Sequence, residues 1–351
     1  MKRMTLIMLI GVTLLFSGCA NLQTANELIK NQKFKDAEKF LIDYTKNNPS
    51  NSDGFNKLGW TYYYIGKYND SIESFKKANK INDNNNNYNG LALSFIKLKK
   101  FDKALRNAKK YKELITRTNT WRSFNLLGYI YLHMHDYENS IINFNKALDL
   151  KKNSYSYLGL SDTYMVKNNL IKSVEFAKKA LTYLRSDNYY SEHHSNIHNR
   201  IANNYYIAGK YDLANYSYKK AFKYYPNLNS YTGLALNNIR LGKYIEAKKN
   251  FEDILNSQFN YQQNFTYYNI LGWYYYYTGE LDKAITSFKE SNELKEIPHN
   301  YYGLWKCYKQ KNIIDKKEFY KKLTIKTFNN FIEKNKYIHK TFLLDMKELK
   351  Y

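Results

Sequence analysis

The hydrophobic positions of the chain recur in blocks of constant order. Each block begins with an apolar residue and a small one, and aromatic or small residues later return every three or four positions. The best-preserved blocks begin at Leu58-Gly59, Leu127-Gly128, Ile201-Ala202 and Leu271-Gly272. In the first block the later positions are Tyr68, Ser71, Phe75 and Ala78. Side chains three or four residues apart share one face of a helix, so the blocks predict helices with a buried face.

Four further blocks keep the order less well, because a glycine stands two places before the small residue. These glycines are Gly90, Gly159, Gly233 and Gly303. Counted from their first positions, the eight units begin near residues 52, 85, 121, 154, 195, 228, 265 and 298. Gaps of 33 residues alternate with gaps of 36 to 41. The alternation predicts a double unit of about 70 residues, with either a longer second helix or a longer connection closing each pair.

This order resembles the tetratricopeptide repeat, a helix–turn–helix unit of about 34 residues. The resemblance covers about residues 21–323, with a degenerate first repeat before residue 52. It implies an all-α, right-handed superhelical solenoid of about eight to nine repeats. It also implies that Gly59 and Gly272 lie at close helix contacts and that Phe75 fills the space between repeats. Gly66 and its counterparts Gly209, Gly242 and Gly279 are expected in the turns between paired helices, where φ is positive.

The two ends of the chain depart from the repeat. From residue 324, Ile325, Phe328 and Ile332 return at helical spacing, which predicts an amphipathic helix over 324–351 that caps the solenoid. At the other end, Lys2 and Arg3 precede an apolar run that reaches Phe16. This run is typical of a secretory signal and is too short to span a bilayer.

The signal ends in Ser17-Gly18-Cys19, which resembles the lipobox of bacterial lipoproteins. The resemblance implies a signal peptide over 1–18, cleavage before Cys19 and lipidation of that residue. Residues 19–51 then hold the lipidated N-terminus and the degenerate repeat, and 52–323 the solenoid. An ordinary signal peptide or an uncleaved anchor is the alternative. Ala20 favours the outer membrane, if the organism has one.

The composition supports a helical chain and excludes several kinds of site and partner. Only 3 Pro and 14 Gly occur among 351 residues, so helix breakers are scarce. Two cysteines exclude a disulfide scaffold and a four-thiolate zinc site. The net charge of +24 suggests nucleic acid, but export removes that partner. Lysine runs such as Lys97-Leu98-Lys99-Lys100 are more typical of a solvated face, with anionic lipid or an acidic partner as the alternative.

No catalytic motif is found, so we expect no enzyme and no cofactor. Cys307 is expected to be a small buried hydrophobic residue rather than a reactive thiol. His194 and His198 are four residues apart and would face one ion on a helix, which makes them weak metal candidates. Their place in the longest connection favours a solvated role.

The resemblance to the tetratricopeptide repeat implies that the first helix of each repeat lines the inner surface. Its fifth position is asparagine in five of the eight repeats, and nearby positions carry aromatic residues. Asparagine can pair with a peptide amide, and Tyr and Trp give rigid contact area. The predicted groove residues are Asn56, Trp60, Tyr63, Asn125, Tyr129, Asn199, Asn203, Tyr206, Asn269, Trp273 and Tyr276. Codon bias toward Asn and Tyr is the competing explanation.

The sequence therefore predicts a lipid-anchored scaffold of the bacterial cell envelope that binds another envelope protein or peptide through this groove. One alternative is a glycan- or peptidoglycan-binding lipoprotein that uses the same aromatic face. Another is a non-catalytic subunit of an envelope enzyme complex. The sequence does not indicate the oligomeric state.

Overall fold

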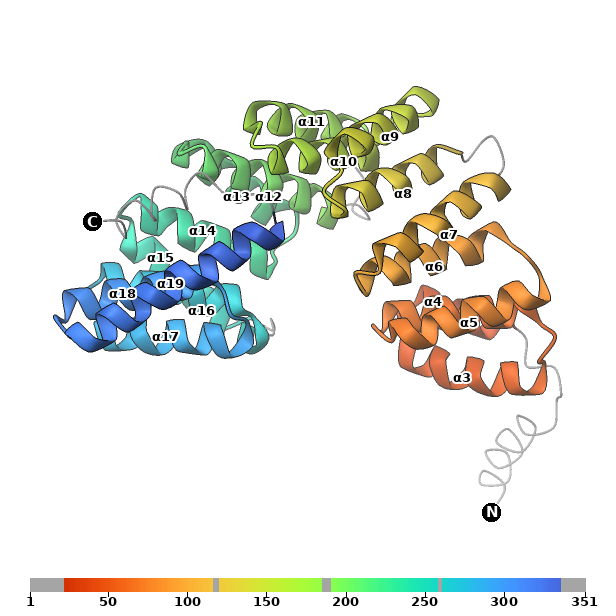
Figure 1. Ribbon diagram of the computed structural model, residues 1–351, viewed down its shortest axis with the longest axis horizontal. Helices are drawn as coiled ribbons and strands as arrows, with labels where there is room; N and C mark the ends of the chain where they lie inside the picture. The colour runs from red at the N-terminus through yellow and green to blue at the C-terminus, as the bar shows by residue number, and fades with distance from the viewer. Residues whose placement is uncertain (1–21, 116–119, 185–190, 258–260, 336–351) are drawn as a thin grey trace, which may run out of the picture. The chain divides into compact units, whose positions relative to one another are not determined.

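The computed structural model describes residues 22–115, 120–184, 191–257 and 261–335. Within these ranges the regular structure consists of eighteen α-helices and one short 3₁₀ helix, η3 (Tyr261–Gln263), and no strand occurs (Figure 1). The prediction of an all-α fold is confirmed. Cys19 and the signal segment lie outside the described residues.

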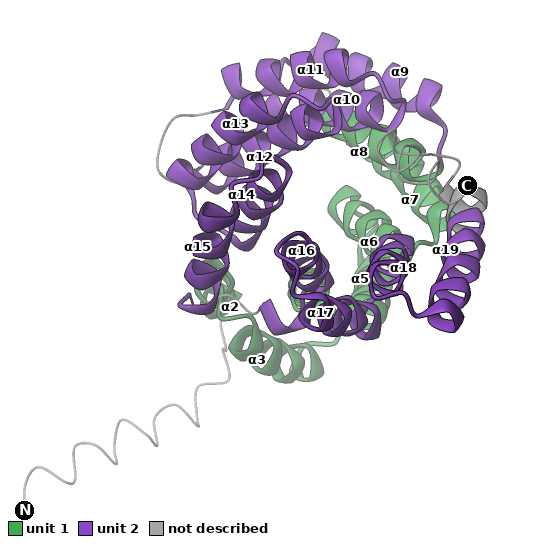
Figure 2. Cartoon of the chain, turned by 90° about the vertical axis from the view of Figure 1, so that its left-hand side faces the viewer, with its two compact units in different colours: residues 1–134 green, residues 135–351 purple. Residues whose placement is uncertain are grey.

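The chain divides into two compact units, residues 1–134 and residues 135–351 (Figure 2). The helices of unit 1 are α2 (Leu22–Lys30), α3 (Phe34–Asn47), α4 (Ser52–Tyr64), α5 (Tyr68–Ile81), α6 (Asn85–Lys97), α7 (Phe101–Leu114) and α8 (Thr120–His133). The helices of unit 2 are α9 (Tyr137–Leu150), α10 (Ser154–Val166), α11 (Leu170–Thr182), α12 (Ser191–Ile207), α13 (Tyr211–Tyr224), α14 (Leu228–Arg240), α15 (Tyr244–Leu255), α16 (Phe265–Tyr277), α17 (Leu281–Leu294), α18 (Pro298–Gln310) and α19 (Ile314–Asn335).

In chain order, even-numbered helices open a repeat and odd-numbered helices close it; we call them A and B helices. Within each unit, every helix packs against the helices that precede and follow it in the chain. In unit 2 the A helices line the inside of the curve and the B helices lie outside (Figure 2). This local, sequential packing is the solenoid arrangement that the repeats predict.

The turn between each A helix and its B helix contains one residue with positive φ. Four of these are glycines, Gly66, Gly209, Gly242 and Gly279, as predicted. The other turns use Gln32, Lys99, His135, Asn168 and Asn312. The nine residues recur in the register of the repeats, and Gln32 places the degenerate first repeat, α2 and α3, in the same register.

A buried aromatic ring joins the two repeats of a double unit. Phe75 on α5 is fully buried between two A helices. A Cβ atom added at Gly59 on α4 would lie 2.8 Å from its ring, and one at Gly90 on α6 would lie 2.2 Å from it. Ser71 completes the contact by donating from Oγ to the carbonyl oxygen of Gly59 at 2.8 Å. The close helix contact predicted at Gly59 is therefore confirmed.

The same arrangement recurs along unit 2 and explains the displaced glycines. Phe288 lies against Gly272 and Gly303, at 2.7 and 2.4 Å from the added Cβ atoms. Tyr218 and Phe144 face Gly233 and Gly159 in the same way, at 2.3 and 2.2 Å. In each double unit, the aromatic ring on the B helix of the first repeat packs against the glycine on the A helix of the second repeat.

The interface between successive double units is built differently. In unit 1, Ala108 stands on α7 where α5 has Phe75, and Leu126 stands on α8 where α6 has Gly90. Three residues connect the repeats within a double unit, as at 82–84, 225–227 and 295–297. Between double units the connections are longer, namely 115–119, 183–190 and 256–264. The predicted alternation in repeat spacing therefore arises from the length of the connections. The size of the residues at the interface alternates with it.

The C-terminal helix differs from the prediction. We expected a separate capping helix from residue 324, but α19 runs without a break from Ile314 to Asn335. No Pro or Gly interrupts this stretch, so the B helix of the last repeat simply continues. Residues 336–351 lie outside the described ranges.

Candidate binding face of the A helices

The eleven predicted groove residues lie on four A helices. Helix α4 carries Asn56, Trp60 and Tyr63, α8 carries Asn125 and Tyr129, α12 carries Asn199, Asn203 and Tyr206, and α16 carries Asn269, Trp273 and Tyr276. The first two helices belong to unit 1 and the others to unit 2. The surroundings of these side chains divide them into groups with different roles.

Two of the asparagines tie one repeat to the next. The Asn56 Nδ2 atom donates to Oδ1 of Asn87 on α6 at 2.5 Å, and the Asn269 Nδ2 atom donates to Oδ1 of Asn300 on α18 at 2.6 Å. Asn87 and Asn300 are buried. These amides therefore stabilise the contact between neighbouring A helices. The sequence held the signal for this role, because in both cases the partner asparagine follows 31 residues later.

Asn199 occupies the same position on α12 but lacks such a partner. The residue 31 positions later is Ser230, whose Oγ atom donates to the carbonyl oxygen of Asn227 in the cap of α14 at 2.8 Å. The Asn199 side chain is 6% exposed, and neither its nitrogen nor its oxygen has a hydrogen-bond partner among the described residues. An unpaired buried amide of this kind costs about 1–3 kcal/mol.

The two predicted tryptophan anchors pack against the core. The ring of Trp60 meets Phe75 edge-on at 5.3 Å, and the ring of Trp273 meets Phe288 edge-on at 5.2 Å between centroids. Both indoles are half-buried. Each one covers the aromatic ring that joins two repeats, so its first role is in packing.

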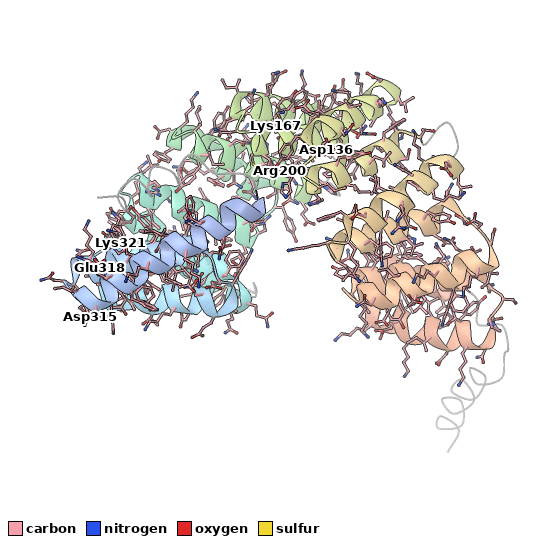
Figure 3. The ribbon with its side chains drawn as sticks, in the orientation of Figure 1. Asp136, Lys167, Arg200, Asp315, Glu318 and Lys321 are labelled. Atoms are coloured by element: carbon pink, nitrogen blue, oxygen red, sulfur yellow. The ribbon has the colours of Figure 1, made fainter. Side chains whose placement is uncertain are left out.

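Polar side chains on the A helices of unit 2 largely engage one another. Arg240 on α14 donates to the hydroxyl oxygens of Tyr206 on α12, at 2.9 Å, and Tyr277 on α16, at 3.4 Å. Asn203 accepts a hydrogen bond from the hydroxyl of Tyr218. Arg200, labelled in Figure 3, pairs with Asp162 on α10. The contacts of Arg240 and Arg200 link successive repeats, and that between Asn203 and Tyr218 joins the two helices of one repeat.

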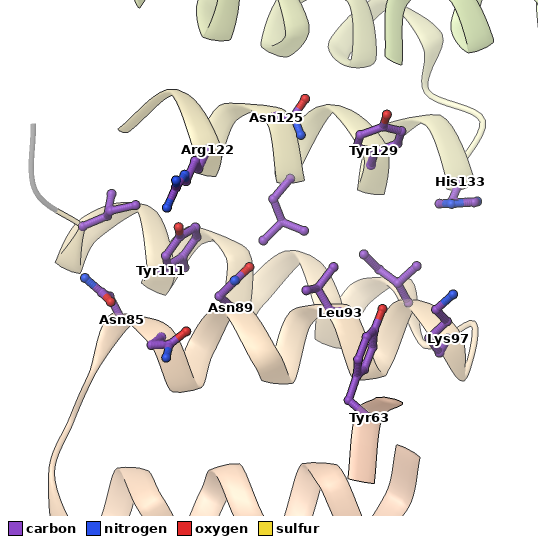
Figure 4. A pocket seen from close by; sticks show the side chains of 14 residues that line it. Tyr63, Asn85, Asn89, Leu93, Lys97, Tyr111, Arg122, Asn125, Tyr129 and His133 are labelled. Atoms are coloured by element: carbon purple, nitrogen blue, oxygen red, sulfur yellow. The ribbon is translucent and has the colours of Figure 1, made fainter. Parts of the chain in front are cut away.

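Unit 1 contains a hollow between α6 and α8. Helix α4 packs directly against α6, whereas α8 packs on α7 and lies farther from α6. Leu126 is buried in the core at this interface, where the preceding repeat has a glycine, and its bulk accounts for the wider spacing. The resulting trough has a volume of about 640 Å³ and runs along both helices (Figure 4).

The trough brings together three of the predicted groove residues, Tyr63, Asn125 and Tyr129. Helix α6 adds one face that includes Asn85, Asn89, Leu93 and Lys97, and α7 adds Tyr111. Helix α8 adds Arg122 and His133. The lining therefore combines amides, hydroxyls and apolar side chains on two parallel faces, a combination suited to an extended chain.

The charge of the trough is uniformly positive. Lys97 lies at one end beside His133, and Arg122 lies at the other end beside Asn85 and Tyr111 (Figure 4). No aspartate or glutamate lines it. Burial raises the pKa values of Tyr111 and Tyr63, so both hydroxyls remain protonated donors near neutral pH. Sequence analysis assigned the run that contains Lys97 to a solvated face and gave Arg122 no role, so neither residue was predicted to line a site.

The two candidate metal ligands lie together but form an aromatic stack. The rings of His194 and His198 stack on Tyr224 of α13, at 4.8 and 5.4 Å between centroids. Burial, with the neighbouring charges of Lys220 and His194, lowers the pKa of His198 to about 4. His193 instead meets Tyr155 on α10. Across the described ranges, no three His, Cys, Asp or Glu side chains gather closely enough to hold a metal ion.

Cys307 occupies the position expected of a core residue. It is fully buried on α18, and burial raises the pKa of its thiol to about 12. The thiol is therefore protonated at neutral pH and unsuited to nucleophilic chemistry.

The comparisons with known proteins agree with the helical repeats. The model of the tetratricopeptide repeat family matches residues 52–85, 122–154 and 265–297. A search among curated proteins finds no match. A crystal structure of a tetratricopeptide repeat protein from Parabacteroides merdae is similar with a TM-score of 0.56 and 17% identity, over 72% of this chain and 96% of that one.

A second similar structure is PilW, described as a widely conserved type IV pilus biogenesis factor. Its TM-score is 0.51 at 16% identity, over 60% of this chain and 96% of that one. At these identities the similarity concerns the fold alone. The chain thus contains tetratricopeptide repeats, and its described residues have the all-α fold of a tetratricopeptide-repeat solenoid.

Proposed function

We propose that this protein is a lipid-anchored scaffold that binds another protein of the bacterial cell envelope through the trough between α6 and α8. Tetratricopeptide-repeat solenoids serve as protein-interaction scaffolds, and their extended surfaces suit that role. The trough itself carries the proposal, because it is hollow, polar and lined by two helix faces.

The side chains of the trough support a peptide ligand. Asn89 makes no side-chain hydrogen bond to any described residue and leaves a donor and an acceptor for a backbone amide. Tyr63 and Tyr129 add rigid contact area with polar tips, and Leu93 adds apolar surface. Asn56 and Asn269, which are already paired between repeats, are not part of this proposed site.

Anchoring rests on the sequence around Cys19. In the part of the chain that the structure describes, no helix combines the length and apolar character needed to cross a bilayer. Lipidation of the thiol and the new amino group of Cys19 would supply several acyl chains, which together hold a protein stably on a membrane. The envelope partner follows from the same signal, since a protein so attached meets other exported proteins.

Site-specific photocrosslinking in intact cells tests the proposed function. A photoreactive phenylalanine analogue replaces Asn89 in the trough, and the control carries it at Lys109, an exposed residue of the outer helix α7. We expect one envelope protein to crosslink from position 89 and not from position 109. Loss of this adduct in the Tyr129→Ala background would tie it to the trough.

Two results would contradict the proposal. Equal adducts from positions 89 and 109 would mean that the trough is not the binding site. Absence of a protein adduct at position 89, together with binding of purified peptidoglycan fragments that Tyr129→Ala abolishes, would favour the glycan alternative.

A further inference from the structure

We infer that the outer groove between the B helices α5 and α7 binds the headgroup of an anionic phospholipid, with the start of its acyl chains on the groove floor. The choice of a lipid rests on the membrane attachment in the proposed function. The groove itself is separate from the trough between α6 and α8. The inference follows from a covering ring that the other double units have and this one lacks, and from the charges around the open space.

Helix α6 forms the floor of the outer groove, and α5 and α7 form its walls. The floor consists of Tyr88, Leu91 and Phe95. Leu91 and Phe95 are buried, and Tyr88 is half-buried. The groove has a volume of about 530 Å³. A space of this size with an apolar floor suits the glycerol backbone and first methylene groups of a lipid.

The other three double units cover the same place with an aromatic ring. In each of them, a ring on a B helix packs against a ring on the A helix that corresponds to α6. The pairs are Phe176 with Tyr164 at 5.3 Å between centroids, Phe222 with Tyr231 at 5.0 Å, and Tyr320 with Tyr308 at 5.3 Å. The A-helix rings of these pairs stand at the positions of Phe95 and Tyr88 in the repeat register.

The first double unit has asparagine where the covering rings stand. Asn107 on α7 corresponds to Phe176 and Tyr320, and Asn79 on α5 corresponds to Phe222. Asparagine is smaller than these residues, and its amide favours a hydrogen-bond partner over an apolar surface. The Nδ2 atom of Asn107 donates to the carbonyl oxygen of Lys103 on its own helix at 2.8 Å. The floor therefore stays open to a ligand.

The walls carry four cations, two on each helix. Lys76 and Lys80 belong to α5, and Lys103 and Arg106 belong to α7. Lys76 pairs with Glu73 at 2.8 Å, an exposed contact of small energy. Lys80 and Arg106 form no ion pair with any described residue, and a guanidinium can hold two phosphate oxygens at once. An anion in the groove therefore meets positive charge from both walls.

One carboxylate also lines the groove, at the connection between α5 and α6. It belongs to Asp83, and its hydrogen bond with Tyr88 raises the pKa of that hydroxyl to about 12. The hydroxyl remains protonated at neutral pH and occupies the carboxylate as a donor. Four cations therefore face a single, already engaged carboxylate.

The charge of this groove distinguishes it from the grooves at the same place in the other double units. In each of those, an acidic residue replaces at least one of the four cations. The replacements are Asp149 and Glu175 in the second double unit, Glu246 in the third and Glu293 in the fourth. The open floor and the concentration of positive charge thus occur together, in the first double unit.

An anionic phospholipid matches both features. Its phosphate suits Lys80 and Arg106, and its first methylene groups would take the place of the covering ring on Tyr88 and Phe95. The anchor proposed at Cys19 would hold the protein at a bilayer, where the local concentration of such lipids is high. A zwitterionic lipid carries its own cation, which the four cations of the walls would repel.

Native mass spectrometry of the full-length protein in non-ionic detergent tests this inference. The probe is dihexanoyl phosphatidylglycerol. Dihexanoyl phosphatidylcholine has the same chains without net charge, and glycerol 3-phosphate has the phosphate without the chains. We expect one phosphatidylglycerol molecule to bind about tenfold more tightly than either matched ligand.

Three variants locate the binding. Arg106→Gln should weaken phosphatidylglycerol binding about tenfold, through the loss of one charge-assisted contact. Lys249→Gln removes one charge at the corresponding position of the third double unit and should leave the affinity unchanged. Asn107→Phe supplies the covering ring that α11 has and should abolish binding. Thermal melting followed by circular dichroism verifies that each variant is folded.

Four results would overturn the inference. Wild type that binds no phosphatidylglycerol has no such site, and equal binding of phosphatidylcholine would mean that the groove does not select an anion. Equal binding of glycerol 3-phosphate, lost in Arg106→Gln, would make the ligand a free phosphate ester. Undiminished binding in a folded Asn107→Phe, or in Arg106→Gln, would place the lipid elsewhere.

Failure of the proposed function would be visible separately. The adduct at position 89 reports the trough, and fatty-acid labelling reports the anchor. Neither measurement involves the outer groove, so Asn107→Phe should leave both unchanged.

Discussion

Phe75 illustrates how single residues hold the repeats together. Its ring fills the space between α4 and α6 only because Gly59 and Gly90 present no side chain there. Protein interiors are closely packed, so an added methyl group displaces the ring or the helix. The pairing of a ring with two glycines recurs at Phe288, which makes it the basic contact of the double unit.

Replacement of Gly90 by Ala should destabilise the protein by about 1–3 kcal/mol through overpacking. The new Cβ atom would lie 2.2 Å from the ring of Phe75. Urea denaturation measures the loss, and Asn89→Ala on the same helix is the control, expected within about 0.5 kcal/mol of wild type. In Phe75→Leu the effect of Gly90→Ala should shrink, because the two sites are coupled. Strictly additive losses would contradict the contact.

The asparagines of the A helices should respond unequally to the same substitution. Asn56→Ala leaves the buried amide of Asn87 without its partner and should cost about 1–3 kcal/mol. Asn199→Ala removes an amide that is already unpaired, so its cost should be at most about 0.5 kcal/mol. Chemical denaturation of the two variants decides this, and equal losses would show that Asn199 has a partner in solution.

At the scale of helices, α12 and α13 meet through an aromatic stack that contains two histidines. The ring of Tyr224 on α13 stacks against the rings of His194 and His198 on α12. The pKa of His198 falls to about 4 from its ordinary value of 6.5, chiefly through burial. The folded state therefore binds fewer protons than the unfolded state between these two pH values.

Stability should consequently decline as the pH falls from about 6.5 to about 4, the window set by the lowered pKa of His198. His198→Phe keeps an aromatic ring and removes the proton-binding site, so it should flatten this dependence. Melting temperatures recorded at pH 7 and pH 5 for both proteins provide the measurement. A pH dependence that is unchanged in His198→Phe would assign the effect to other groups.

Much of the arrangement of helices and turns could be predicted from the sequence. The repeat register, the turns at Gly66 and its counterparts, and the alternation of short and long repeat spacings all follow from local chain chemistry. The unbroken helix α19 was not anticipated, because amphipathic spacing cannot tell a new helix from the continuation of an old one.

The candidate site was predicted only in part, for a physical reason. Tyr63, Asn125 and Tyr129 line the trough, whereas Asn56 and Asn269 pair with residues of the next repeat. A pattern within one repeat does not report a contact between two repeats. The hollow itself depends on the spacing of α6 and α8, which no single-helix pattern contains.

At the scale of the whole molecule, the proposed lipid anchor lies outside the sequence of the repeats. The anchor predicted at Cys19 precedes the first described helix, α2. The repeats are held by contacts between neighbouring helices, so their fold does not require the proposed anchor.

Cys19→Ser should release the protein from membranes, because the apolar run before it is too short to span a bilayer. Fractionation after metabolic labelling with a fatty acid checks this, with Cys307→Ser as the control, since its thiol is buried. Labelling of wild type but not of Cys19→Ser is the expected result. An unlabelled wild-type protein would remove lipid anchoring from the proposed function.

Hydrogen exchange tests most directly whether unit 1 binds the partner in the trough between α6 and α8. Amide exchange is recorded for the full-length protein with and without the segment captured at position 89. We predict added protection over Asn85–Lys97 and Thr120–His133, and none over Ser191–Ile207 or Phe265–Tyr277. Protection confined to the A helices of unit 2, or to the outer helix α7, would contradict the claim.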